Sequence, residues 1–222
     1  MRIGLKFSRR GNAKFVSHLD MQRVMGRALR RSGLPVKYSE GFNPHIVMSF
    51  ASALPVGMET EGDYLEFQLI EDMKIEKVRE ALSQSMPEGL AIQKAWRIGD
   101  GAPKLMAAAA ESEYEIGICT QDPEKFQKAL ENLLASTSCM IEKKKKGRVR
   151  QVDIRPLIQL AQYDSQTGIL RTRLMCSGEK SLTPKTLLQQ LAGEDTIFGV
   201  SKLVRKDLYY YNKDKLTSLE ML

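Results

Sequence analysis

The sequence contains few of the residues that usually carry redox, metal or acid–base chemistry. Its 222 residues include only three cysteines and two histidines. The cysteines (Cys119, Cys139 and Cys176) are odd in number and scattered, which excludes a disulfide framework, a zinc finger and an iron–sulfur cluster within this chain. No other spacing of side chains indicates a metal site, and we expect the chain to hold neither a metal nor a cofactor.

Long apolar runs are missing as well. No stretch of about 18 apolar residues is present, so nothing in the sequence predicts a membrane span. Residues Met1–Lys6 lack the apolar core of a signal peptide and resemble a strand instead, which favours a cytoplasmic protein. A hydrophobic content of 42% beside 27% charged residues is typical of a globular fold.

Charge is abundant and unevenly distributed along the chain. The net charge is +7, with basic residues concentrated at both ends. Residues 1–50 carry ten Lys or Arg and two Asp or Glu, whereas residues 51–142 carry eight and seventeen. Residues 143–222 are basic again, with sixteen and eight. This separation predicts either one anion-binding surface built from both ends or attraction between the basic and acidic blocks.

Apolar periodicity predicts the same order of elements in both halves of the chain. In residues 1–100 we expect extended segments at 2–8, 36–38, 46–53, 63–70 and 90–98, and helices at 17–32 and 74–86. In residues 111–222 we expect strands at 113–119, 138–145, 148–163, 169–176 and 199–211, with helices opening at Asp122 and Thr183. With 36–53 and 138–163 each taken as one interrupted extended region, each half follows the order β-α-β-β-α-β. Two copies predict an α+β fold of two tandem ferredoxin-like domains, 1–100 and 111–222, with residues 101–110 as the linker.

The helix predicted at 17–32, with a capping box at Ser17 and Asp20 and Gly33 as its stop, gathers arginines on one face. Arg23, Arg27 and Arg30 fall with Arg31 within about 100° of arc, opposite the apolar residues that should pack on the sheet. A planar guanidinium suits phosphate, and we interpret the stripe as a phosphate-binding face. A solvated face that pairs with the acidic block is an equally good interpretation. The predicted phosphate contacts of this region are Arg9, Arg10, Lys14, Arg23, Arg27, Arg30, Arg31 and Lys37.

A second basic cluster lies at Lys143–Arg150, where we expect a hairpin that turns at Gly147. Basic hairpins commonly enter a nucleic-acid groove. Lysines also protect edge strands from aggregation, but this cluster exceeds what protection needs, so we favour binding. The predicted nucleic-acid contacts here are Lys143, Lys144, Lys145, Lys146, Arg148, Arg150 and Arg155.

The two histidines are the only side chains that suggest acid–base catalysis. His18 projects toward the sheet on an ideal helix, which favours a structural role, whereas His45 follows a loop and is more accessible. If the two rings met, they would have the chemistry to cleave RNA without a metal. The loop before His45 is also a candidate ligand site, and its residues are Tyr38, Ser39, Gly41, Phe42, Asn43 and His45.

Several segments resemble a known family. They are Phe15–Asp20, Arg30–Val36, Tyr38–His45, Ala53–Gly57 and Val152–Ile158. In these segments the chain resembles the radical-SAM-linked bacterial family, a domain of unknown function found alone or fused to radical SAM proteins with a cobalamin-binding-type region, often encoded near ribonuclease G. The resemblance implies a radical SAM partner and a setting in RNA metabolism, and it implies no catalytic residues.

Together these features predict an RNA-binding accessory protein that acts with a radical SAM partner in RNA modification or processing. One alternative is a metal-independent endoribonuclease that uses His18 and His45. Another is a protein adapter whose basic helix docks on an acidic partner. The expected partners are therefore RNA and a radical SAM protein, and no membrane.

Overall fold

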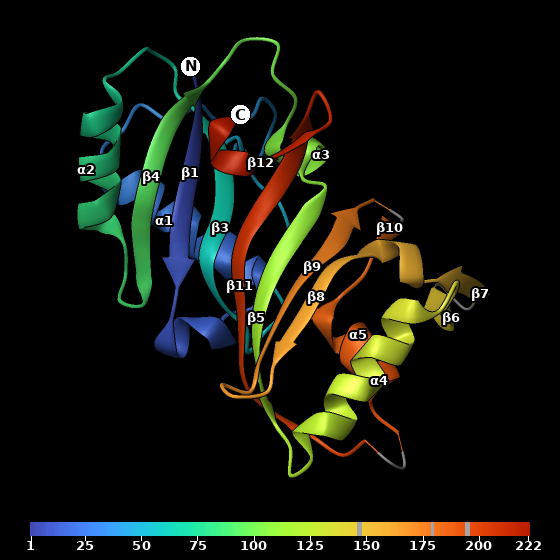
Figure 1. The fold of residues 1–222 in the computed structure, drawn as a ribbon. Helices are drawn as coiled ribbons and strands as arrows, with labels where there is room; N and C mark the ends of the chain where they lie inside the picture. The colour runs from blue at the N-terminus through green and yellow to red at the C-terminus, as the bar shows by residue number, and fades with distance from the viewer. Residues whose placement is uncertain (146–147, 179, 194–195) are drawn as a thin grey trace. The chain divides into compact units, whose positions relative to one another are not determined.

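A computed structural model of the chain describes residues 1–145, 148–178, 180–193 and 196–222 (Figure 1). The chain divides into two compact units. Unit 1 consists of Met1–Ala109 and Arg205–Leu222, and unit 2 of Ala110–Val204. Residues 205–222, which the sequence led us to expect in the second domain, thus belong with unit 1. Strand β11 (Gly199–Asn212) contributes its first part to unit 2 and its second part to unit 1.

Unit 1 follows the predicted order of elements. It contains β1 (Arg2–Arg9), η1 (Gly11–Phe15), α1 (His18–Arg31), β2 (Met48–Phe50), β3 (Glu59–Gln68), α2 (Ile75–Ser85), β4 (Leu90–Ile98) and α3 (Leu105–Ala108). The strands pair antiparallel in the order β4-β1-β3-β2. Strand β3 begins already at Glu59, before the predicted start at residue 63, because its first residues are polar and hide the alternation. The C-terminal segment adds the second part of β11, β12 (Lys215–Ser218) and η3 (Leu219–Met221).

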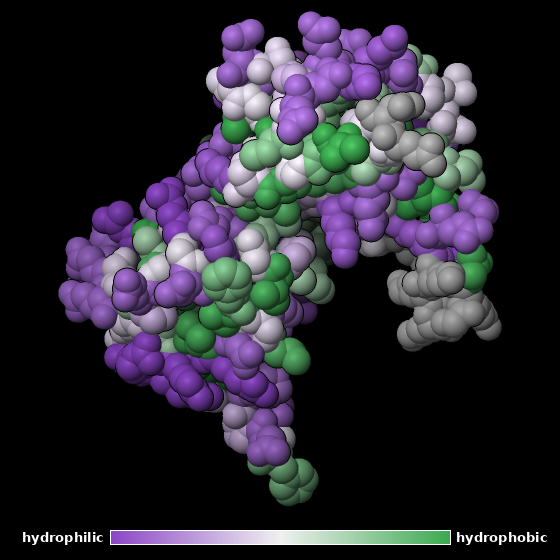
Figure 2. Space-filling view, turned by 90° about the horizontal axis from the view of Figure 1, so that it is seen from below, coloured by the Kyte–Doolittle hydropathy of each residue, from purple (hydrophilic) through white to green (hydrophobic). Residues whose placement is uncertain are grey.

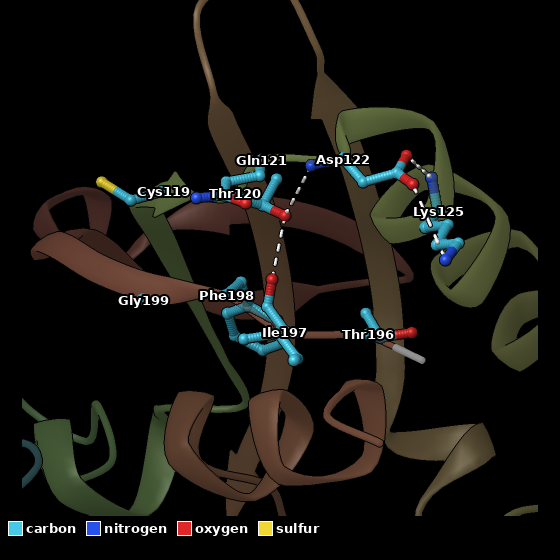
Figure 3. Close-up of a pocket in the computed structure, with 9 residues that line it drawn as sticks. All are labelled: Cys119, Thr120, Gln121, Asp122, Lys125, Thr196, Ile197, Phe198 and Gly199. Carbon is cyan, nitrogen blue, oxygen red and sulfur yellow. Dashed lines mark hydrogen bonds and ion pairs between the residues drawn. The ribbon is translucent and has the colours of Figure 1, made fainter. Parts of the chain in front are cut away.

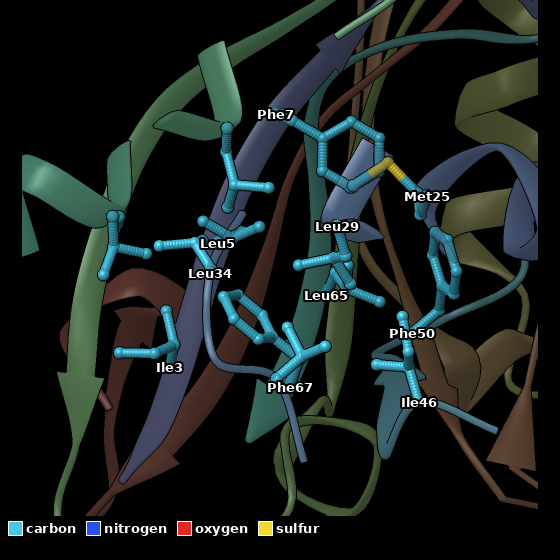
Figure 4. Packing of buried hydrophobic residues seen from close by; sticks show 14 of the residues in the cluster. Ile3, Leu5, Phe7, Met25, Leu29, Leu34, Ile46, Phe50, Leu65 and Phe67 are labelled. Carbon is cyan, nitrogen blue, oxygen red and sulfur yellow. The ribbon is translucent and has the colours of Figure 1, made fainter. Parts of the chain in front are cut away.

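The core of unit 1 lies between the sheet and its two long helices. The alternation in β1 turns Ile3, Leu5 and Phe7 toward the helices, where all three are fully buried (Figure 4). Met25 of α1 and Val78 of α2 belong to the same cluster, so both helices cover one face of the sheet. The amphipathic pattern predicted for α1 is confirmed, since its buried residues are Met21, Met25, Gly26, Ala28 and Leu29.

The C-terminal segment is fixed to unit 1 by charged side chains. The Arg205 guanidinium donates to Asp63 Oδ1 at 2.7 Å, and both side chains are buried. Burial raises the pKa of Asp63, and the neighbouring Arg205 opposes that rise. Lys6 Nζ lies 3.0 Å from Asp207 Oδ2 and 2.8 Å from Glu220 Oε2. These pairs explain why residues 205–222 belong with unit 1.

Unit 2 is built around β9 (Ile169–Ser177). This strand pairs antiparallel with β5 (Glu111–Cys119), β8 (Ile158–Asp164) and the short β10 (Lys180–Ser181). The predicted basic hairpin is confirmed as a separate two-stranded sheet of β6 (Met140–Lys145) and β7 (Arg148–Asp153). The 3₁₀ turn η2 (Arg155–Leu157) separates β7 from β8 at the predicted break near Pro156. The helices of unit 2 are α4 (Pro123–Ala135) and α5 (Pro184–Leu191).

The chain is a mixed α/β protein with mostly antiparallel strands, which confirms the predicted fold class in its coarse form. Within the described ranges, no helix is both long enough and apolar enough to span a bilayer.

Candidate nucleic-acid interface

A groove of about 750 Å³ lies between α1 and the segment from His45 to Phe50, all within unit 1. We call it the α1 groove. Its helical wall consists of positions three or four residues apart, so one stripe of α1 faces it. The lining residues are Leu19, Gln22, Arg23, Gly26, Arg27 and Arg30 from α1, and His45, Ile46, Met48 and Phe50 from the opposite wall.

The arginine stripe is held in place by a well-defined helix start and stop. The side chain of Ser17 caps α1 and accepts a hydrogen bond from the Asp20 N–H at 3.2 Å, which confirms the predicted capping residue. The Ser17 hydroxyl and the Arg23 guanidinium both hydrogen bond to Asp20 and lower the pKa of its carboxyl. Gly33 follows the helix with a φ of 69°, a conformation that glycine adopts without strain.

The four arginines of α1 differ in their partners. Arg23 donates to Asp20 Oδ1 at 2.7 Å, and Arg31 donates to the Ser85 carbonyl of α2 at 2.7 Å. Arg27 and Arg30 are exposed, and among the described residues neither has a hydrogen bond or an ion pair. Two adjacent guanidinium groups at the groove are therefore available for an anionic ligand.

The floor of the groove is apolar. Ile46 and Phe50 are buried at 4% and 6% exposure, and Met48 is half-buried beside them. Gly26 is also buried, and a Cβ built at this position would meet only the Cε atom of Met48, at 3.6 Å. The groove thus combines cationic arginines with an apolar floor.

The loop that ends at His45 is closed by its own hydrogen bonds. Ser39 N donates to the His45 carbonyl at 2.8 Å, and His45 N donates to Ser39 Oγ at 3.1 Å. His45 Nδ1 shares a further hydrogen bond with Ser39 Oγ at 2.9 Å, while in the described part of the chain Nε2 has no partner. The loop also carries Phe42, whose side chain is fully exposed, and Tyr38, which is partly exposed. Gly41 has a φ of 114°, a backbone conformation that other residues rarely adopt.

His18 lies beside the groove and does not line it. Its ring packs edge-on against Phe50, with ring centroids 5.2 Å apart, and its Nε2 lies 3.2 Å from the Gln22 amide. Both contacts agree with the structural role expected for His18. No hydrogen bond or ring contact joins His18 to His45 in the described ranges, and each ring has its own partners, Gln22 and Phe50 for His18 and Ser39 for His45.

Arg9 has a different position from the one expected. It is buried at 1% exposure, where its Nε donates to the Ala13 carbonyl at 2.8 Å and its Nη2 to the Val16 carbonyl. We expected Arg9 to contact phosphate, but its guanidinium instead satisfies the backbone of the segment that leads into α1. Arg9 is therefore not part of the candidate interface.

The other cations near α1 are exposed to different degrees. Arg10 Nη2 lies 3.5 Å from Glu61 Oε1, and Lys14 Nζ lies 3.4 Å from Glu59 Oε1. Exposed pairs of this kind are weak and open readily. Lys37 is exposed on the strand-like segment that pairs with Val47. These three residues extend the positive charge of unit 1 beyond the α1 groove.

The basic hairpin of unit 2 is described only in part. Its register pairs Lys143 with Arg150, and Lys143 Nζ donates to the Ser181 carbonyl at 2.7 Å. Lys146 and the side chains of Lys144, Lys145 and Arg148 lie outside the described residues. Arg155 donates from Nε and Nη2 to the Leu134 carbonyl at 2.9 and 2.7 Å, so it stabilises the end of α4. We therefore do not place Arg155 in the interface.

A second cavity, of about 660 Å³, lies at the start of α4 in unit 2 (Figure 3). Thr120 Oγ1 donates to the Ile197 carbonyl at 2.9 Å and accepts from Asp122 N at 3.2 Å. Asp122 in turn caps α4 by accepting from Lys125 N at 3.0 Å. The cap at Asp122 was predicted from the sequence, but the cavity was not, because residues 196–199 reach it from a distant part of the chain. Thr120, Asp122 and Lys125 thus have partners within the cavity wall, and we assign the cavity no ligand.

The exposed surface is mixed in polarity. On the face drawn in Figure 2, hydrophilic side chains surround smaller apolar patches. In unit 1 the exposed large apolar side chains include Phe15, Leu19 and Phe42. Among the described residues, no three His, Cys, Asp or Glu side chains are grouped so that they could hold a metal ion.

Comparison with known proteins places the chain in a family. A family model described as an uncharacterized protein conserved in bacteria (DUF2344) matches residues 2–184. No curated protein matches the chain. The match covers all of the α1 groove and most of unit 2.

Proposed function

The chain belongs to the bacterial family that this model describes, and we propose that it is an RNA-binding protein whose α1 groove contacts the RNA. The observation that carries the proposal is the pair Arg27 and Arg30. Both guanidinium groups are exposed beside an apolar floor and have no partner among the described side chains. A guanidinium group can donate two hydrogen bonds to one phosphate, and the RNA backbone carries a phosphate at every nucleotide.

Single-stranded or irregular RNA suits this surface better than a regular duplex. Proteins that bind unpaired RNA combine cations for the backbone with aromatic and apolar surfaces for the bases. The α1 groove has an apolar floor, and Phe42 is fully exposed on the loop that carries His45. A purely phosphate-binding surface would not need these apolar groups.

We further propose that the protein acts with a radical SAM partner in RNA modification or processing. Support for this partner comes from the segments that resemble the radical-SAM-linked family, including Tyr38–His45, which forms the loop at the groove. The cysteines Cys119 and Cys139 stand apart in the sequence, so the iron–sulfur chemistry would belong to the partner. We also infer that both units follow the ferredoxin-like plan. Unit 1 has the strand order β4-β1-β3-β2, with β1 and β3 at the centre of its strands. Unit 2 likewise has the adjacent strands β5 and β9 at its centre.

Neither alternative function has a comparable observation. An endoribonuclease would need two acid–base groups at one bond, and His18 is held by Phe50 and Gln22 instead. A protein adapter would use the same arginines and apolar floor against an acidic surface, and no observation favours it over RNA.

Measurement of RNA affinity as a function of salt tests the proposal. The double variant Arg27→Ala/Arg30→Ala should bind an RNA with unpaired nucleotides more weakly and flatten the slope of log affinity against log salt by about 0.7 for each single-strand phosphate that the arginine pair contacts. Arg79→Ala is the matched control, because Arg79 is an exposed arginine on α2, away from the groove.

Two results of these binding measurements would contradict the proposal. Wild-type protein that binds no RNA at low salt contradicts it, as does equal weakening by Arg79→Ala and the double variant. If an acidic polypeptide competes with RNA for the wild type and binds it more tightly than RNA does, the adapter function replaces the RNA-binding one.

A further inference from the structure

We infer that the α1 groove holds one unpaired nucleotide, with its phosphate on Arg27 and Arg30 and its base on the apolar floor beside Gly26. The inference rests on the proposed RNA-binding function and specifies the part of the RNA that enters the groove.

The polarity of the groove matches that of a nucleotide. Arg27 and Arg30 offer free cations, whereas the floor of Ile46 and Phe50 is apolar and buried. A nucleotide has the same division, since its phosphate is charged and the faces of its base are not. The volume of about 750 Å³ lies within the range of roughly 300–1,000 Å³ that is usual for small-ligand sites.

Gly26 gives the floor its depth. Glycine is unfavourable inside a helix, and only proline is worse. Neither packing nor backbone conformation requires it here. A Cβ would make only an ordinary 3.6 Å contact with Met48, and Gly26 is not among the glycines with positive φ. A glycine on the stripe that lines the groove does allow a flat ring to approach the helix backbone closely.

The arginine pair has the spacing to hold a single phosphate. Residues three apart on a helix are neighbours on its surface, so Arg27 and Arg30 point to the same region. Their neighbours on the helix have partners in the structure, Arg23 in an exposed ion pair with Asp20 and Arg31 at the Ser85 carbonyl. The free charge of α1 is therefore concentrated at one place along the groove.

The loop on the opposite wall offers contacts to the rest of the nucleotide and to its neighbour. The His45 ring lines the groove, and its Nδ1 is tied to Ser39 at 2.9 Å, which leaves Nε2 for a ligand. Phe42 is fully exposed on the same loop and is available to stack on an adjacent base. A base that is stacked inside an RNA duplex cannot reach such a floor. The groove should therefore bind RNA bulges, loops or single strands.

Three RNA hairpins that differ at one position test the inference with the full-length protein. The first contains a single bulged 2-aminopurine nucleotide, the second carries an abasic residue at the bulge, and the third is fully paired. All three keep the same phosphates outside the bulge. The wild type should bind the bulged RNA about fivefold or more tightly than the abasic one, because one stacked base contributes at least this much. The fluorescence of the bulged base should change on binding.

A variant that fills the floor provides the second measurement. Gly26→Leu should reduce the ratio of abasic to bulged dissociation constants to about one, while the abasic RNA still binds through the arginines. Gly99→Leu is the matched control, because nothing lies within 4 Å of a Cβ at Gly99 and its φ is not positive. If Gly26→Leu does not fold, the smaller Gly26→Ala should lower the ratio in the same direction.

The outcomes separate this inference from the proposed function. A wild-type ratio near one, with RNA binding that still depends on Arg27 and Arg30, overturns the nucleotide site and leaves the RNA-binding function intact. Loss of both the ratio and the arginine dependence overturns the proposed function as well. Nucleoside monophosphates titrated alone distinguish the source of the nucleotide, and tighter binding of a monophosphate than of the bulged RNA overturns the assignment to RNA.

Discussion

Gly26 of α1 and Met48 of β2 meet where they line the α1 groove, and a Cβ on Gly26 would lie 3.6 Å from the terminal methyl group of Met48. This distance is an ordinary van der Waals contact, so alanine fits at position 26. We expect Gly26→Ala to raise the free energy of unfolding by about 0.5–1 kcal/mol, because alanine favours the helix. Urea denaturation measures the change.

Gly62→Ala is the control for this prediction. A Cβ at Gly62 would lie 2.8 Å from the Lys206 carbonyl oxygen, closer than real Cβ contacts allow. This variant should therefore destabilise the protein. A Gly26→Ala variant that is less stable than wild type would show that the glycine is required for folding, and the argument for an open floor would fail.

The cap of α1 yields a second prediction. Ser17→Ala should lower the free energy of unfolding by about 1 kcal/mol, since the Asp20 N–H would lose its side-chain acceptor. The same change should raise the pKa of Asp20 toward its ordinary value, because the Ser17 hydroxyl is the main cause of its low pKa. Carbon-detected NMR titration follows this carboxyl. Ser83→Ala on α2, an exposed hydroxyl that bonds only to the Arg79 carbonyl, should have little effect on either quantity.

The buried pair Arg205 and Asp63 yields a third prediction. Arg205→Met alone should lower the free energy of unfolding by about 3–5 kcal/mol, because it leaves the Asp63 carboxyl without its closest cation. The double variant Asp63→Leu/Arg205→Met should recover a large part of this loss. Thermal and urea unfolding of the three proteins measure the coupling. Additive losses in the double variant would show that the pair does not act as a unit.

The contact between Lys6 and Glu220 makes stability depend on pH. Burial opposes ionisation of Glu220, but hydrogen bonds and charge from Lys6 outweigh it and lower the pKa of Glu220 below 4.5. A carboxyl with a lowered folded pKa stabilises the protein above its unfolded pKa and loses this effect as pH falls through the folded value. The gap in melting temperature between wild type and Glu220→Gln should therefore be constant near neutral pH and close below pH 4.5. A gap that persists at low pH would contradict this assignment.

The sequence predicted the parts of the structure that depend on local patterns. The helix α1 is predicted by the Ser17 cap, the spacing of Met21 and Met25, and the stop at Gly33, and all three have these roles in the structure. The arginine stripe followed from the same periodicity. The groove itself was not predicted. Its opposite wall is the segment from His45 to Phe50, and tertiary packing sets the distance between this segment and α1.

The parts that were missed depend on long-range contacts or unusual turns. Arg9 is the charged last residue of β1, and no local pattern in the sequence indicates that its guanidinium is buried and donates to backbone carbonyls such as that of Ala13. The assignment of residues 205–222 to unit 1 depends on Arg205 and Asp63, which are distant in sequence. Strand β12 follows a turn in which Lys213 and Asp214 have φ values of 46° and 66°. Such turns usually contain Asn-Gly or Asp-Gly, so this one gave a weak signal.

Ultraviolet crosslinking of the protein to RNA in cells, followed by mass spectrometry of the crosslinked peptides, tests the RNA-binding role of the α1 groove most directly. We expect crosslinks within α1 and the segment Tyr38–Phe50, with loss of most of them in the Arg27→Ala/Arg30→Ala variant and retention in Arg79→Ala. Absence of RNA crosslinks from unit 1, or crosslinks that are the same in the double variant, would contradict the proposed interface.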